Sequence, residues 1–418
     1  MKTLIKLIAL GALASVVLAG ISAHAAESSE ELTAKHDYSL ITSVPPSAVL
    51  DKMEALSFEG SDGTVLPYRK YYSPAYNAED KENPAMVFVF LHGSGGQGDD
   101  NEQQIKDQIA TVNYLVSPSA EEVLADVPYI VIAPQCHKEN QWVNTPYNQN
   151  SYNIDEVPVS PPLNAVYELI LKVLEEDNAD KDNVMLGGIS MGGYGAWDLA
   201  TRHPELFNAI FPICGSGDPS HAENLKDIKI WTFHSDNDTA VPVKGTREMV
   251  AALEEIGADV HYTEFQNKGH NAWRPAMDEV KDPYLLEWLI EDCRLYTVNV
   301  LTKEGEEISE TTEKLRIGDK FSIEMEPSEG FVPEKLYVNG VESEFVTDDN
   351  GSLYIECTVT GDMEITAEFV EETTEEESSV AEGGKGGLST GAKIGIIAGA
   401  AAVLGGIIGI IAAKKKKK

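Results

Sequence analysis

The feature that most constrains the fold is a series of short, almost wholly apolar runs separated by stretches with helical period. These runs do not alternate polar and apolar residues, as a strand with one solvated face would. Runs of this kind are typical of strands buried on both faces, and helical connections between them make the strands parallel. We therefore predict a mostly parallel sheet flanked by helices, with strands at Met86–Leu91, Tyr129–Ala133, Asn183–Gly187, Ala209–Ile213 and Lys229–Phe233.

The pattern changes after Cys293, so the chain divides into several parts. Residues 55–293 form the predicted large domain, and residues 26–54, polar and then proline-bearing, form a spacer before it. Residues 294–370 contain short β-type segments broken by glycine and aspartate, which predicts a small all-β domain. Residues 371–390 are rich in Glu, Ser and Thr and then in Gly, which is typical of a flexible stalk.

Both ends of the chain carry targeting patterns. Residues 1–25 combine two lysines, an apolar stretch and the site Ala23-His24-Ala25, which predicts a cleaved export signal. Near the other end, Ile394–Ala413 is an apolar run of 20 residues, long enough to span a bilayer, and five lysines follow it. We expect residues 391–418 to be a transmembrane anchor with a cytoplasmic lysine tail, and the domains to lie on the extracellular face of the membrane.

The lysine-tailed helix also resembles the cell-wall sorting signal of Gram-positive bacteria. Residues 387–391 lack the proline that the sorting motif requires, so a retained membrane anchor is favoured over processing by sortase. The source expected from this resemblance is a Gram-positive bacterium. Glycine spacings in the run match a helix-pairing pattern, but the oligomeric state stays open.

Charge and cysteine content exclude several classes of protein. The formal net charge is −37, whereas a nucleic-acid-binding surface needs clustered Lys and Arg, so we expect no nucleic-acid partner. The four cysteines include no CxxC spacing, which indicates neither a zinc cluster nor a redox pair. We therefore expect no metal and no organic cofactor, and export permits a disulfide without indicating one.

The segment Gly188–Gly192 reads GISMG and fits the pattern G-x-S-x-G. It follows the apolar strand Asn183–Gly187 and opens a predicted helix at Met191–His203. This strand–turn–helix context holds a serine in a strained turn with small neighbours, and the helix N-terminus favours a developing anion. We therefore predict Ser190 as a nucleophile.

A nucleophilic serine needs a base, and in this type of fold the chain order is serine, acid, histidine. His270 lies in a glycine-containing loop after the strand-like segment Val260–Phe265, where such a base is expected. Three other histidines are alternatives, each with a plausible structural role in or beside a helix or strand: His203, His234 and His261.

Two aspartates follow the strand Lys229–Phe233 and could orient the base. Asp238 has the better placement in the loop, whereas Asp236 more often shapes such a turn. A tetrahedral oxyanion also needs two backbone N–H donors, which we expect from Met191 and from Ser94 in the glycine-rich loop after the first strand.

With these residues assembled, residues 55–293 resemble bacterial esterases of the α/β-hydrolase superfamily. The likeness rests on four motifs in the expected order: FLHGSGGQGDDN, GGISMGGYGAWDLATRHPELF, HSDNDTAVP and GHNAW. It is greatest for secreted carboxylesterases, feruloyl esterases and polyhydroxybutyrate depolymerases, often described as prolyl-oligopeptidase-like hydrolases. It implies the α/β-hydrolase fold, a Ser190–Asp238–His270 triad, an acyl-enzyme intermediate, and a small ester or acylated glycan as substrate. Trp142 and Trp273 lie near candidate loops and are candidates to line the pocket, with a core position as the alternative.

The small β domain resembles one divergent internalin-type B-repeat, through its GFV element at residues 330–332 and its closing TAEF at residues 366–369. Two other functions stay open. One is a serine peptidase of the prolyl-oligopeptidase-like type, although the chain has no room for a gating β-propeller. The other is an inactive surface adhesin or glycan-binding protein, against which the complete set of triad residues argues.

Overall fold

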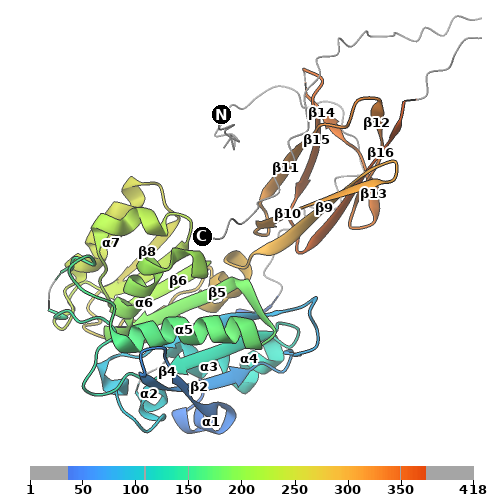
Figure 1. Ribbon diagram of the computed structural model, residues 1–418. Helices are drawn as coiled ribbons and strands as arrows, with labels where there is room; N and C mark the ends of the chain where they lie inside the picture. The colour runs from blue at the N-terminus through green and yellow to red at the C-terminus, as the bar shows by residue number, and fades with distance from the viewer. Residues whose placement is uncertain (1–35, 108–109, 149, 349, 373–418) are drawn as a thin grey trace, which may run out of the picture. The chain divides into compact units, whose positions relative to one another are not determined.

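The computed structural model describes residues 36–107, 110–148, 150–348 and 350–372 (Figure 1). The expected export signal, almost all of the expected stalk and the expected membrane anchor lie outside these residues. Within the part of the chain that is described, no helix is both long enough and apolar enough to cross a membrane.

An eight-stranded sheet forms the first domain, in the order β1-β2-β4-β3-β5-β6-β7-β8. The strands from β4 to β8 along this order are all parallel, and β1 and β2 add an antiparallel edge. The predicted mostly parallel sheet is therefore confirmed, and the antiparallel edge is an addition to it. The strands are β1 (Glu54–Glu59), β2 (Val65–Tyr72), β3 (Ala85–Leu91), β4 (Tyr129–Pro134), β5 (Ala179–Ile189), β6 (Ala209–Ile213), β7 (Lys229–Ser235) and β8 (Val260–Phe265).

Helices cover both faces of this sheet, because alternate side chains of each strand enter two separate apolar cores. In β3, Phe88 and Phe90 enter the core with α1, α3, α4, α8 and α9, whereas Val87 and Val89 enter the core with α5, α6 and α7. Figure 1 shows α5 and α6 lying across the sheet. The helices are α1 (Pro46–Lys52), α2 (Gln103–Lys106), α3 (Ala110–Leu115), α4 (Pro118–Val123), α5 (Pro161–Glu176), α6 (Met191–Arg202), α7 (Val243–Glu255), α8 (Trp273–Asp278) and α9 (Leu285–Glu287).

The segment before β1 corrects one expectation. Residues 26–54 were expected to be a spacer, yet four apolar side chains of this segment are buried in the core beside α3 and α8. From Tyr38 onward the segment covers apolar surface that would otherwise face water, and it packs as part of the first domain. The buried side chains are Tyr38, Ile41, Val49 and Met53.

After the first domain, the described chain is all-β, as expected. It forms a five-stranded sheet in the order β10-β9-β16-β12-β13 and a three-stranded sheet in the order β11-β15-β14, around a separate apolar core. β10 was not expected, because its residues are almost all exposed and carry no apolar pattern. The strands are β9 (Tyr296–Glu304), β10 (Glu307–Leu315), β11 (Lys320–Met325), β12 (Phe331–Val338), β13 (Val341–Ser343), β14 (Val346–Thr347), β15 (Leu353–Thr358) and β16 (Met363–Glu371).

Candidate active site

Ser190 occupies the sharp turn between β5 and α6. Its backbone has φ 53° and ψ −116°, a conformation that residues other than glycine rarely adopt. Its N–H donates to the carbonyl of Ile213 at 2.8 Å. The turn leaves no space for side chains on either side. A Cβ on Gly188 would come within 2.2 Å of the Gly192 carbonyl oxygen. The glycines of the motif are therefore required by packing, and the turn presents the serine hydroxyl at the N-terminus of α6.

His270 lies in the loop between β8 and α8, and its Nε2 is 2.8 Å from the Ser190 Oγ. Its other ring nitrogen, Nδ1, is 2.6 Å from Oδ2 of Asp238. Since the carboxylate can only accept, we assign the proton to Nδ1, which leaves Nε2 to accept from the serine hydroxyl. The ring of Trp273 packs edge-on against the imidazole, with centroids 5.6 Å apart.

The loop that carries His270 is attached to the loop after β7 by three hydrogen bonds. The backbone N–H groups of residues 267, 268 and 269 donate to side-chain oxygens of Asp236, Ser235 and Asn237 in turn, at 2.7 to 2.9 Å. The loop that supplies the acid thus also positions the base. Asp236, the alternative acid, is occupied in this attachment, and the structure brings Asp238 to His270 instead.

The side chain of Asp238 has no exposed surface. Its Oδ1 accepts from the backbone N–H groups of Ala240 at 2.8 Å and Val241 at 2.9 Å. Burial alone raises the pKa of this carboxyl, but hydrogen bonds from His234, His270 and the Val241 amide outweigh burial and hold the pKa well below its usual range. Asp238 is therefore a carboxylate over the whole range in which a histidine titrates.

The three alternative histidines lie elsewhere. His203 stacks on Tyr167 at 3.8 Å between ring centroids, and His261 is more than half exposed beside Asp259. His234 is fully buried, and its Nε2 lies 3.3 Å from Oδ2 of Asp238, the same oxygen that faces His270. The sequence analysis missed this contact, although the position of His234 at the end of β7 was a signal for it.

The two expected oxyanion donors lie at the starts of helical turns. Met191 is the first residue of α6, and Ser94 opens a short 3₁₀ turn after β3. Within the described residues, neither N–H donates to another backbone carbonyl. The two elements are in direct contact, because a Cβ on Gly192 would meet the carbonyl oxygens of Leu91 and His92 at 1.9 and 2.8 Å.

The loop after β3 is supported from behind by His92 and Trp142. His92 is fully buried: Nδ1 donates to the Gly93 carbonyl at 2.6 Å, and Nε2 accepts from the Cys136 N–H at 2.9 Å. Burial lowers the pKa of His92 to about 4, so the ring is neutral at neutral pH. Trp142 also has no exposed surface and donates from Nε1 to the His92 carbonyl at 3.0 Å. Trp142 therefore lies in the core, the alternative position for it, and its indole contacts this loop.

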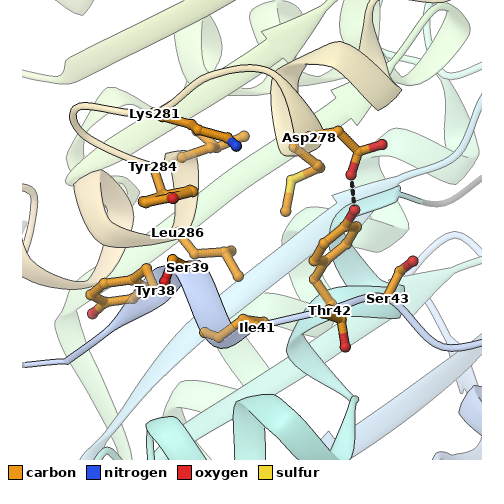
Figure 2. Close-up of a pocket in the computed structure, with 12 residues that line it drawn as sticks. Tyr38, Ser39, Ile41, Thr42, Ser43, Asp278, Lys281, Tyr284 and Leu286 are labelled. Carbon is orange, nitrogen blue, oxygen red and sulfur yellow. Dashed lines mark hydrogen bonds between the residues drawn. The ribbon is translucent and has the colours of Figure 1, made fainter.

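Two cavities lie between the segment before α1 and helix α8. The first, of about 330 Å³, is shown in Figure 2, with Tyr38 and Tyr284 at one end and Asp278 at the other. The second, of about 320 Å³, is lined in part by Trp273. Neither cavity is lined by any of the three hydrogen-bonded residues Ser190, His270 and Asp238. Trp273 thus both lines the second cavity and contacts the imidazole of His270.

One cluster beside the site has metal-binding residue types. Cys214, His234 and Asp238 bring their sulfur, nitrogen and oxygen atoms within 4.8 Å of one another. Both nitrogens of His234 and both oxygens of Asp238 already have hydrogen-bond or ion-pair partners, so a metal would have to displace them. The donor set fits a hydrogen-bonded cluster better than a metal site. All four cysteines are free: Cys136, Cys214, Cys293 and Cys357.

Residues 76–285, half of the chain, match the family described as phospholipase/carboxylesterase. The chain belongs to this family. Its sheet is the α/β-hydrolase sheet, and the phospholipase/carboxylesterase match contains all the site residues described above. No curated protein matches the chain.

Among solved structures, one described as a thermostable esterase is 34% identical, with a TM-score of 0.50, and the match covers 58% of this chain and 63% of that one. This chain thus spans less than two thirds of that esterase's length. A ferulic acid esterase is 15% identical, with a TM-score of 0.41, and the match covers 57% of this chain and 98% of that one. The feruloyl esterase module from Clostridium thermocellum, solved with sinapinate, is 12% identical, with a TM-score of 0.39 and coverage of 60% and 91%.

Proposed function

We propose that this protein is an extracellular carboxylic-ester hydrolase that acts through Ser190, His270 and Asp238. The observation that carries the proposal is the continuous hydrogen-bonded chain from the Ser190 Oγ through the imidazole to Asp238, at 2.8 and 2.6 Å. Membership of the phospholipase/carboxylesterase family and the likeness to the thermostable esterase support an ester as substrate.

The geometry suggests the usual two-step reaction of a serine hydrolase. The Ser190 oxygen attacks the ester carbonyl carbon while Nε2 of His270 takes its proton, and the N–H groups of Met191 and Ser94 stabilise the oxyanion. The tetrahedral intermediate collapses to an acyl-serine, and the proton on Nε2 goes to the departing alcohol. Water then attacks the acyl-serine, His270 takes the water's proton, and the acid leaves as Ser190 regains its hydrogen.

The substrate class is a small ester or an acylated glycan. Trp273 supports a pocket beside the imidazole, because its ring packs edge-on against that of His270. The export signal predicted at residues 1–25 and the membrane anchor predicted around Ile394–Ala413 support a position on the outer face of the membrane, with the B-repeat-like domain between enzyme and anchor in chain order. Protease added to intact cells should then remove the enzyme domain and leave a short, lysine-tailed fragment.

A panel of short acyl esters, acetylated xylan, feruloyl esters and peptides tests the function with the full-length chain. We expect turnover of at least one ester and none of the peptides. Asp238→Asn should lower turnover at least ~10²-fold, because it removes the charge that stabilises the imidazolium. Asp236→Asn is the matched control and should keep most of the turnover, because its side chain holds the loop and does not contact His270. Cleavage of peptides alone, or an inactive Asp236 variant beside an active Asp238 variant, would overturn the proposal.

A further inference from the structure

Asp238 of the proposed triad contacts a second histidine, His234, besides His270. The Nε2 of His234 lies 3.3 Å from Oδ2 of Asp238, the same oxygen that accepts from His270. His234 is fully buried, and Asp238 has no exposed side-chain surface, so water does not compete for this contact. A buried contact of this kind orients a carboxylate far more strongly than an exposed one.

The protonation of His234 at Nε2 follows from its surroundings. The two atoms facing Nε2 are Oδ2 of Asp238 and, at 3.1 Å, the carbonyl oxygen of Val241, and both can only accept. Nε2 must therefore carry a hydrogen. With the hydrogen on Nε2, the other nitrogen, Nδ1, accepts from the Thr246 hydroxyl at 2.7 Å. The ring is thus held at both ends, which fixes the direction in which Nε2–H points.

We propose that His234 is a positioning residue whose Nε2–H is shared between the Val241 carbonyl and Oδ2 of Asp238, and that it holds the carboxylate in the orientation that serves His270. The inference rests on the proposed function, since it assigns a part of the same site. Without His234, Oδ2 would keep only His270, and the angle of the carboxylate would depend on the two backbone N–H groups that donate to Oδ1. His234 does not touch the substrate, so its effect should fall on turnover and not on substrate binding.

Other titratable groups around this pair do not change charge in the working range. Tyr194 of α6 and Cys214 at the end of β6 face Asp238, and burial raises the pKa of both well above the usual range. Glu264 of β8 is paired with His234 across the sheet, and its hydrogen bond with Arg247 lowers its pKa, so it stays charged. A change in the pH profile on replacing His234 would therefore act through Asp238 and His270.

Two substitutions separate the roles of the two ring nitrogens. In His234→Gln the amide nitrogen can reach the place of Nε2 and keep the donor to Asp238. In His234→Asn it reaches only the place of Nδ1 and keeps the contact with Thr246. Both variants remove the ring, so both should lower the melting temperature to a similar extent. Thr246→Val is the control for stability, because it loosens the ring without removing the Nε2 donor.

The readouts are the rate of labelling by a fluorophosphonate, which needs an activated serine but no particular ester, and hydrolysis of p-nitrophenyl acetate by the full-length chain. His234→Gln should stay within about threefold of wild type, and His234→Asn should be slower by about tenfold or more in labelling and in kcat, with KM unchanged. The acid limb of the pH–rate profile of His234→Asn should also move to higher pH. The reason is that a carboxylate with one donor fewer attracts the proton on His270 more strongly.

The inference is overturned if the Gln and Asn variants label at equal rates, or if all three variants lose rate only in proportion to the fall in melting temperature. Failure of the proposed function looks different. In that case wild type itself is not labelled at Ser190, and the His234 inference falls with it.

Discussion

Gly192 lies directly against the end of β3, so close that a Cβ on it would come within 1.9 Å of the Leu91 carbonyl oxygen. This contact joins the N-terminus of α6 to the loop that carries Ser94. Both proposed oxyanion donors are therefore positioned by one backbone contact. The motif needs glycine at position 192, because there is no room for a Cβ atom there.

Replacing Gly192 with alanine should damage both stability and activity. The added methyl group must push α6 away from β3, which should lower the free energy of unfolding by about 1–3 kcal/mol and displace the Met191 N–H. Urea unfolding and ester turnover measure the two effects. Gly60→Ala is a suitable control, because the nearest atom to its Cβ is the end of the flexible Glu168 side chain at 3.3 Å. An active, fully stable Gly192 variant would show that this contact does not position the site.

Two buried tryptophans offer a matched test of the loop after β3. Trp142 and Trp197 are both fully buried, but Nε1 of Trp142 donates to the His92 carbonyl, whereas Nε1 of Trp197 has no hydrogen-bond partner among the described residues. Trp142→Phe should therefore lower the free energy of unfolding by about 1–3 kcal/mol through the unsatisfied carbonyl, and lower kcat several-fold with little change in KM. Trp197→Phe should lower stability less and leave kcat unchanged. Equal kcat values for the two variants would contradict the supporting role of Trp142.

Asp100 gives a prediction about pH and stability. Burial is the largest single effect on its pKa and raises it, but hydrogen bonds from the Gln135 side chain and from two backbone N–H groups together outweigh burial and lower the pKa to about 2. Because the folded pKa is lower than the unfolded one, Asp100 stabilises the fold above about pH 4, and this contribution is lost as the pH falls toward 2. Asp100→Asn should lower stability at pH 7 by about 1 kcal/mol or less, since the group is exposed, and the difference should vanish near pH 2. Urea unfolding of wild type and Asp100→Asn at pH 7, 4 and 2 measures this difference in stability. A difference that does not change with pH would show that the charge of Asp100 is not its cause.

Much of the fold could be predicted, because the sequence patterns that indicate it involve residues close together in the chain. Each buried strand has a continuous apolar run, and the elbow around Ser190 has its own pattern of small residues between a strand and a helix. The chain order of serine, aspartate and histidine then placed Asp238 and His270 in candidate loops. These predictions depend on a few neighbouring residues and on a rule of chain order, so a single sequence carries them.

The remaining features depend on how the chain packs or folds back on itself, which the local sequence pattern does not show. The burial of Tyr38 and Val49 follows from apolar surface on α3 and α8, which no pattern near residue 40 reveals. Trp142 lies near a candidate loop, which left a pocket and a core position both open, and its indole turns inward to the His92 carbonyl. The contact of His234 with Asp238 needs the loop after β7 to fold back on its own strand. β10 has no apolar pattern because its side chains face water on both sides.

Labelling by a fluorophosphonate, with the adduct mapped by mass spectrometry of peptides, tests the central claim most directly. The probe reacts with a serine only when a base activates it, and it requires no knowledge of the natural substrate. We expect one adduct on wild type, located on Ser190, and none on Ser190→Ala, whose melting temperature should stay close to that of wild type. An adduct on another residue, or equal labelling of the alanine variant, would contradict the assignment of Ser190 as the nucleophile.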